Sequence, residues 1–109
     1  MPYNDELALR IRIALEGQDG MLERKMFGGL CFMLNGNVCC GVTNDDMMVR
    51  VGPNGQEEAL AQPGARPMDF TGRSIKGFVF VGLQATLDDQ VLAQWVERGV
   101  AFARTLPVK

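Results

Sequence analysis

Apolar residues recur at helical spacing near both ends of the chain and gather in short runs between them. Residues 4–16 are predicted to form a helix, because an asparagine can cap its start and the apolar side chains fall on one stripe. A second helix is predicted over residues 87–106, with Thr86 and Asp89 as its capping pattern. Gly99 interrupts the apolar face of this helix, which suggests that another backbone approaches it closely.

Two turn signals divide the central stretch, residues 25–51, into short apolar runs. Asn35-Gly36 is a strong hairpin signal, because both positions of a type I′ turn need positive φ. A second two-residue turn is predicted at Asp45-Asp46. The pattern therefore predicts an antiparallel meander, with strands over residues 22–27, 30–34, 37–43 and 47–51.

The rest of the chain predicts a short helix and a second strand pair. A capping box at Asn54 favours a helix up to residue 61. Residues 65–70 are expected to be extended, and residues 77–81 are typical of a strand. Strand runs grouped between helices indicate an α+β fold with an antiparallel sheet. At 109 residues, the chain is predicted to form a single domain over residues 1–109.

The predicted register sorts the meander side chains onto two faces. A loop at Asn35-Gly36 places Cys31 opposite Cys40. The face that carries Cys31 and Met33 is predicted to be the core. The other face is too apolar for a simple solvent face, so a helix, the N-terminal arm or a second copy of the chain should cover part of it. Four of its side chains are candidate interface residues: Leu30, Phe32, Cys39 and Met48.

Composition narrows the possible functions. A net charge of −2 does not favour general nucleic-acid binding, although it allows a local basic patch. The absence of histidine removes the usual general base and the commonest metal ligand, so no catalytic residue, metal or cofactor is predicted. The odd number of cysteines favours a reducing cytoplasm. No signal peptide or membrane span is expected, because the sequence has neither pattern.

The cysteines are the first candidates for chemistry. Cys39 and Cys40 are neighbours on a predicted strand, so their side chains should point to opposite faces and cannot hold a metal together. Cys31 and Cys40, opposite each other, could form a redox pair or serve a small thiol-dependent enzyme. The simpler interpretation is that all three are small buried hydrophobic side chains.

Five basic residues flank the predicted sheet and could converge on one anion-binding surface. Arginine is well suited to carboxylate and phosphate ligands. The alternative interpretation is a set of scattered charges that pair with Asp and Glu. An anion- or nucleic-acid-binding module is therefore a further functional hypothesis, with these candidate residues: Lys25, Arg50, Arg66, Arg73 and Lys76.

Several of these segments resemble one known family, the TfoX N-terminal domain found in TfoX/Sxy regulators of natural competence. The segments are Lys25-Met26-Phe27-Gly28-Gly29, the turns at Asn35-Gly36 and Asp45-Asp46, and the strand Met48-Val49-Arg50-Val51. Residues 66–73, followed by Lys76-Gly77-Phe78-Val79, are similar to small bacterial members in which the domain stands alone. The regulators add a helical C-terminal domain that this sequence does not contain, so a transcriptional role in competence is not expected.

The resemblance implies an α+β fold similar to that of the type III secretion chaperones, which commonly dimerise. It implies no established enzymatic activity and no catalytic residues. The leading hypothesis is therefore a non-enzymatic, cytoplasmic protein-interaction or regulatory domain. It is expected to form a homodimer, and an unidentified protein partner is also possible.

Overall fold

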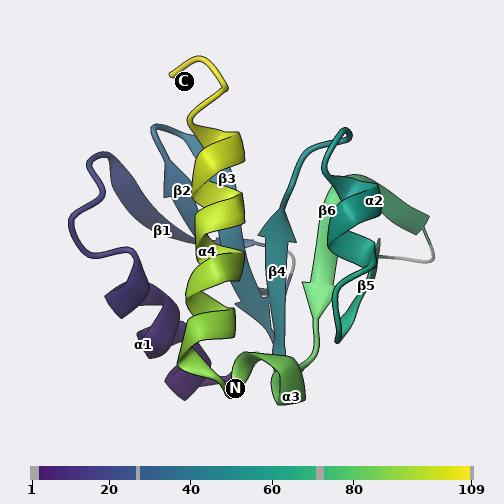
Figure 1. The fold of residues 1–109 in the computed structure, drawn as a ribbon. Helices are drawn as coiled ribbons and strands as arrows, with labels where there is room; N and C mark the ends of the chain where they lie inside the picture. Colours follow the sequence, from purple (N-terminus) through teal and green to yellow (C-terminus); the bar gives the residue numbers. More distant parts are fainter. Residues whose placement is uncertain (1–2, 27, 71–72, 109) are drawn as a thin grey trace.

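A six-stranded sheet with helices against one face forms the framework of the computed structural model, which describes residues 3–26, 28–70 and 73–108 (Figure 1). The strand order is β1-β2-β3-β4-β6-β5, and neighbouring strands are antiparallel. The predicted α+β class is confirmed. The helices are α1 (Asp5–Ala14), α2 (Gln56–Leu60), α3 (Leu83–Thr86) and α4 (Asp89–Ala103), and the strands are β1 (Met21–Met26), β2 (Gly29–Leu34), β3 (Asn37–Thr43), β4 (Asp46–Arg50), β5 (Ala65–Phe70) and β6 (Arg73–Val81).

The caps of the two longer helices differ in how well the sequence predicts them. Asn4 caps α1 as predicted, since its side chain accepts a hydrogen bond from the Leu7 N–H. At α4 the predicted pattern of Thr86 and Asp89 is wrong, because Asp88 is the cap and accepts from two backbone N–H groups. Thr86 instead belongs to α3, where its hydroxyl donates to a carbonyl of the same turn.

The two hairpin turns follow from their asparagines. Asn35 and Gly36 have φ of 53° and 85°, which confirms the type I′ turn. In the second hairpin Thr43 lies opposite Asp46, so the loop begins one residue earlier than predicted. Asn44 takes the left-handed conformation there, with φ of 53°. Asparagine tolerates this conformation better than most residues, which explains the position of the turn.

A bulge in β3 determines which side chains reach the core. Phe32 lies opposite Cys40 and Met33 lies opposite Val38, so Cys39 is an extra residue on β3. The predicted pairing of two cysteines across the strands is therefore wrong. Beyond the bulge the predicted core face is confirmed, and before it the two faces are exchanged, because one extra residue reverses the alternation of side chains.

The exchange of the two sheet faces by the bulge changes the position of the candidate interface residues. Leu30, Phe32 and Cys39 are buried in the core cluster that α1, α2 and α4 share with the sheet. The prediction that these three lie on the face opposite the main core is wrong, and the bulge is the physical reason. The helices cover them, which is one of the three covers that the sequence allowed. Met48 does lie on the other face, together with Cys31, which was predicted for the core.

The long helix α4 crosses the sheet at the bulge. A Cβ atom at Gly99 would lie only 2.6 Å from the carbonyl oxygen of Cys39. The predicted close approach of a backbone to Gly99 is confirmed. The glycine thus allows α4 to lie directly on β3, where the chain makes its central contact between helix and sheet.

Candidate interaction surface

Among the strands that the structure describes, β1 pairs with β2 alone and forms one outer edge of the sheet (Figure 1). Four consecutive side chains on this strand, from Leu22 to Lys25, are exposed. An edge strand presents unpaired backbone N–H and C=O groups, which are able to pair with another strand. The opposite edge, β5, contains Pro67, which has no N–H to donate. β1 is therefore the more suitable edge for strand addition.

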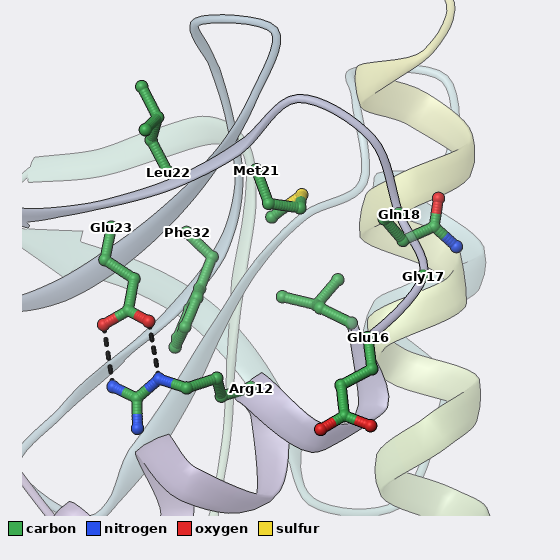
Figure 2. A pocket seen from close by; sticks show the side chains of 9 residues that line it. Arg12, Glu16, Gly17, Gln18, Met21, Leu22, Glu23 and Phe32 are labelled. Atoms are coloured by element: carbon green, nitrogen blue, oxygen red, sulfur yellow. Dashed lines mark hydrogen bonds and ion pairs between the residues drawn. The ribbon is translucent and has the colours of Figure 1, made fainter.

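The side chains of β1 alternate between the two faces of the sheet. Glu23 lies opposite Phe32 on the helix side, and Leu22 lies opposite Met33 on the other side. Figure 2 shows Leu22 and Glu23 pointing away from each other. By the same alternation Lys25 shares the side of Glu23, and Arg24 shares the side of Leu22. The edge thus carries an acid and a base on one face.

A groove of about 430 Å³ opens between α1 and β1, beside this edge (Figure 2). Leu15, Met21 and Phe32 give it an apolar lining. Arg12 on α1 bridges to Glu23 on β1 with two hydrogen bonds, Nε to Oε2 at 2.5 Å and Nη2 to Oε1 at 2.7 Å. This bidentate ion pair links the helix to the edge strand, in addition to the packing of Leu7 and Ile11 of α1 in the core.

The ion pair makes a pH-dependent contribution to stability. Its hydrogen bonds from Arg12 lower the pKa of Glu23 below the ordinary value of 4.5. A lowered folded-state pKa means that the stabilisation is present above the unfolded value and is lost as the pH falls through the folded value. We expect wild type to lose more stability than Glu23→Gln between about pH 5 and pH 3, by less than about 1 kcal/mol because both side chains are partly exposed. Urea denaturation at both pH values measures this, and equal losses would contradict it.

The face of the sheet opposite the helices is largely closed by its own side chains. Cys31 and Met48 are each 1% exposed, and Met68 from β5 is fully buried among them. Met26 and Ile75, which are partly buried, pack around this cluster. The sheet face is therefore a second small core, whereas a helix, the N-terminal arm or a second copy of the chain was expected to cover part of it.

The basic candidates are distributed over both edges and the middle of the sheet. Lys25 lies on β1, at the opposite edge from Arg66 on β5. The Arg66 guanidinium pairs with Asp46 at 2.5 Å and lies 5.2 Å from the centre of the Phe80 ring. Arg66 therefore already has an acidic and an aromatic partner. Because Lys25 and Arg66 lie at opposite edges of the sheet, the described basic candidates do not form one cluster.

The other three basic candidates lie on β4 and β6. The Arg50 guanidinium carbon lies 5.5 Å from the Phe78 ring and 5.4 Å from the Phe102 ring, as in cation–π contacts. Lys76 is exposed, and the side chain of Arg73 lies outside the described part of the structure. Anion binding by this set stays a prediction, and salt-dependent binding of a polyanion would test it.

One family model matches most of the chain. The model of the TfoX N-terminal domain matches residues 14–103, from the end of α1 to the end of α4. The chain belongs to the TfoX N-terminal domain family. Searches of curated proteins and of solved structures gave no match. The matched range includes β1, all three cysteines and the residues that line the groove except Arg12, and the family suggests a regulatory or interaction domain.

The cysteines of this TfoX N-terminal domain are all buried and unlinked. The bulge places both Cys39 and Cys40 in the helix-covered core, so the prediction that they point to opposite faces is wrong. A hydrogen bond with Cys39 and burial raise the pKa of Cys40 well above its ordinary value. Burial raises the pKa of Cys31 to about 11. At neutral pH these two thiols are protonated, and the thiolate is the reactive form.

We therefore expect the native domain to resist thiol reagents. A chromogenic disulfide reagent at pH 7.5 should release almost no colour from the folded chain, and three equivalents after unfolding in guanidinium. Rapid reaction of one equivalent with the folded protein would contradict the burial of the thiols and revive the thiol-dependent alternative.

Sequence reasoning missed the groove and the edge strand. The sequence does not predict that Arg12 and Glu23 form an ion pair, because their pairing depends on how α1 packs beside β1. The available signal was the run Met21–Met26, a proline-free strand with three consecutive charges.

Across residues 3–26, 28–70 and 73–108, no group of three or more Cys, Asp or Glu side chains lies close enough together to hold a metal ion. No helix in the described ranges is long and apolar enough to cross a membrane.

Proposed function

We propose that this chain is a non-enzymatic protein-interaction domain with a regulatory role in the cytoplasm, and that it works as a homodimer. The observation that carries the proposal is the uncovered edge of β1, four consecutive exposed residues long and free of proline. Strand addition at such an edge supplies main-chain hydrogen bonds, and side chains that alternate between the faces supply specificity.

Two further observations support interaction over catalysis. The thiols, the strongest nucleophiles of a chain without histidine, are buried in the two cores. The groove beside β1 has an apolar lining, and two of its three charged side chains, Arg12 and Glu23, bind each other. This arrangement suits the contact of a protein segment better than the activation of a small substrate.

Size-exclusion chromatography with light scattering tests the proposal. We expect a mass twice the 12.0 kDa of one chain at micromolar concentration, decreasing on dilution as the dimer dissociates. An exposed substitution on α4, Glu97→Gln, serves as a control and should leave the mass unchanged. A mass of 12.0 kDa at every concentration would contradict the homodimer.

A further inference from the structure

We infer that two copies associate through β1, which pairs antiparallel with β1 of the second copy about a two-fold axis at Arg24. The inference rests on the proposed function, because it names the surface and the register of the proposed dimer. The two sheets would then form one continuous sheet, with the helices of both copies on the same side.

Symmetry limits the registers that two identical strands can adopt. Antiparallel strands side by side in one sheet are related by an axis perpendicular to that sheet. Such an axis keeps each side chain on its own face, and residues directly opposite each other share a face. The axis must therefore pass beside one residue of β1, which lies opposite itself, and this residue fixes the other pairs.

The register centred on Arg24 matches the chemistry of both faces. On the helix side, Glu23 lies opposite Lys25 of the second copy, and symmetry repeats this ion pair. On the other side, Leu22 lies opposite Met26 of the second copy, again twice. Leu22 is 68% exposed in the single chain, so this contact would cover the most exposed apolar side chain of the strand. Pairs of opposite charge and of apolar side chains are those that stabilise antiparallel strands.

The neighbouring registers lack this complementarity. An axis at Glu23 places two carboxylates opposite each other, and an axis at Lys25 places two ammonium groups opposite each other. An axis at Leu22 forms no ion pair within β1. The Arg24-centred register contains one repulsive contact, Arg24 against its own symmetry mate. Neither Arg24 nor Lys25 has an ion-pair partner among the described residues, so the second copy would supply the first partner of Lys25.

The charges on β1 would also limit which strands can pair with this edge. Charged side chains on an edge strand normally discourage the addition of other strands. Here the same charges disfavour the registers centred on Glu23 and on Lys25. The register centred on Arg24 instead contains two attractive pairs, each of Glu23 with Lys25. Other surfaces are less suitable, since β5 carries Pro67 and the face opposite the helices is closed by its own side chains.

Intermolecular disulfide formation by single cysteine variants tests the register directly. Arg24→Cys should form an intermolecular disulfide under mild oxidation, because opposite Cα atoms lie about 4.5–5.5 Å apart, within disulfide range. Leu22→Cys and Lys25→Cys are matched controls on the same strand, and they should not crosslink because each lies opposite a different residue. The native cysteines are buried and should not compete. Strong crosslinking of a control, or none of any variant, would overturn the register.

A charge exchange tests the same register without oxidation. Lys25→Glu places carboxylates opposite Glu23 at both symmetric positions, and we expect dimer affinity to fall about tenfold. Adding Glu23→Lys restores opposite charges and should recover most of the affinity, even though it removes the ion pair with Arg12. Failure of the double variant to recover affinity would contradict the pairing of Glu23 with Lys25.

The outcomes separate this inference from the proposed function. A wild-type chain that is monomeric by light scattering would overturn both. A wild-type dimer in which Arg24→Cys does not crosslink would overturn the register and leave the homodimer standing. A dimer that crosslinks at Arg24→Cys and not at the two controls would support both.

Discussion

Replacing Gly99 with valine is expected to lower the free energy of unfolding by about 3 kcal/mol, at the upper end of the usual cost of overpacking. A Cβ at this position would lie 2.6 Å from the carbonyl oxygen of Cys39 and 3.2 Å from its Sγ. The carbonyl belongs to the backbone of a central strand, so it cannot move aside without disturbing the sheet. Valine also adds two methyl groups, and the helix must shift away from β3 to accommodate them.

Two companion variants separate the clash from helix propensity. Ala101→Val lies on an exposed position of the same helix and should cost no more than about 0.7 kcal/mol, the propensity difference. Gly99→Ala gains about 1 kcal/mol in helix propensity and still meets the carbonyl, so we expect a net loss smaller than that of valine. Urea denaturation measures all three. Equal midpoints for Gly99→Val and Ala101→Val would contradict the direct packing of α4 on the bulge.

Truncating Met48 to alanine is expected to cost about 2–4 kcal/mol, within the range for large-to-small core substitutions. Met48 is 1% exposed in the single chain and packs with Cys31, Met68 and Phe80. Removing its side chain leaves a cavity in a cluster that already excludes water. If this face of the sheet were instead exposed in the monomer, the same truncation would scarcely change the free energy of unfolding of the monomer.

Leu22→Ala is the matched control on the same side of the sheet. Leu22 is 68% exposed, so its truncation should change the free energy of unfolding of the monomer by less than about 0.5 kcal/mol. Denaturation at concentrations below the dimer dissociation constant makes the comparison. Similar small losses for Met48→Ala and Leu22→Ala would contradict the second core.

Local signals account for the part of the fold that the sequence predicts well. The Asn35-Gly36 turn, the Asn4 cap and the strand Asn37–Thr43 each depend on residues close together in the chain. Gly99 belongs with them, because a glycine inside an apolar helix face is a local sign of close packing. These signals were sufficient for the fold class.

The faces of the sheet were harder to predict, because a single bulge decides them. The segment Cys39-Cys40 contains no glycine or other usual bulge signal. The bulge packs against α4 at Gly99, which lies sixty positions further along the chain. One unrecognised extra residue reversed the assignment of Leu30 and Phe32 and hence the candidate interface.

The edge strand was unpredictable for a different reason. That β1 is an outer strand follows from the pairing of β4 with β6, which joins the meander and the second hairpin into one sheet. Neither periodicity nor turn chemistry specifies a pairing between strands that are so far apart in sequence. The groove beside β1 likewise depends on where α1 packs, and this packing brings Arg12 next to Glu23 only in the folded chain.

Hydrogen exchange of the β1 amides as a function of protein concentration tests the central claim most directly. Dimerisation through this edge should protect the outward-pointing amides of residues 21–26 at high concentration. On dilution that protection should be lost, while the amides of β3 and β4 exchange as slowly as before. Fast exchange along the outer side of β1 at every concentration, in a sample that light scattering shows to be dimeric, would contradict the account.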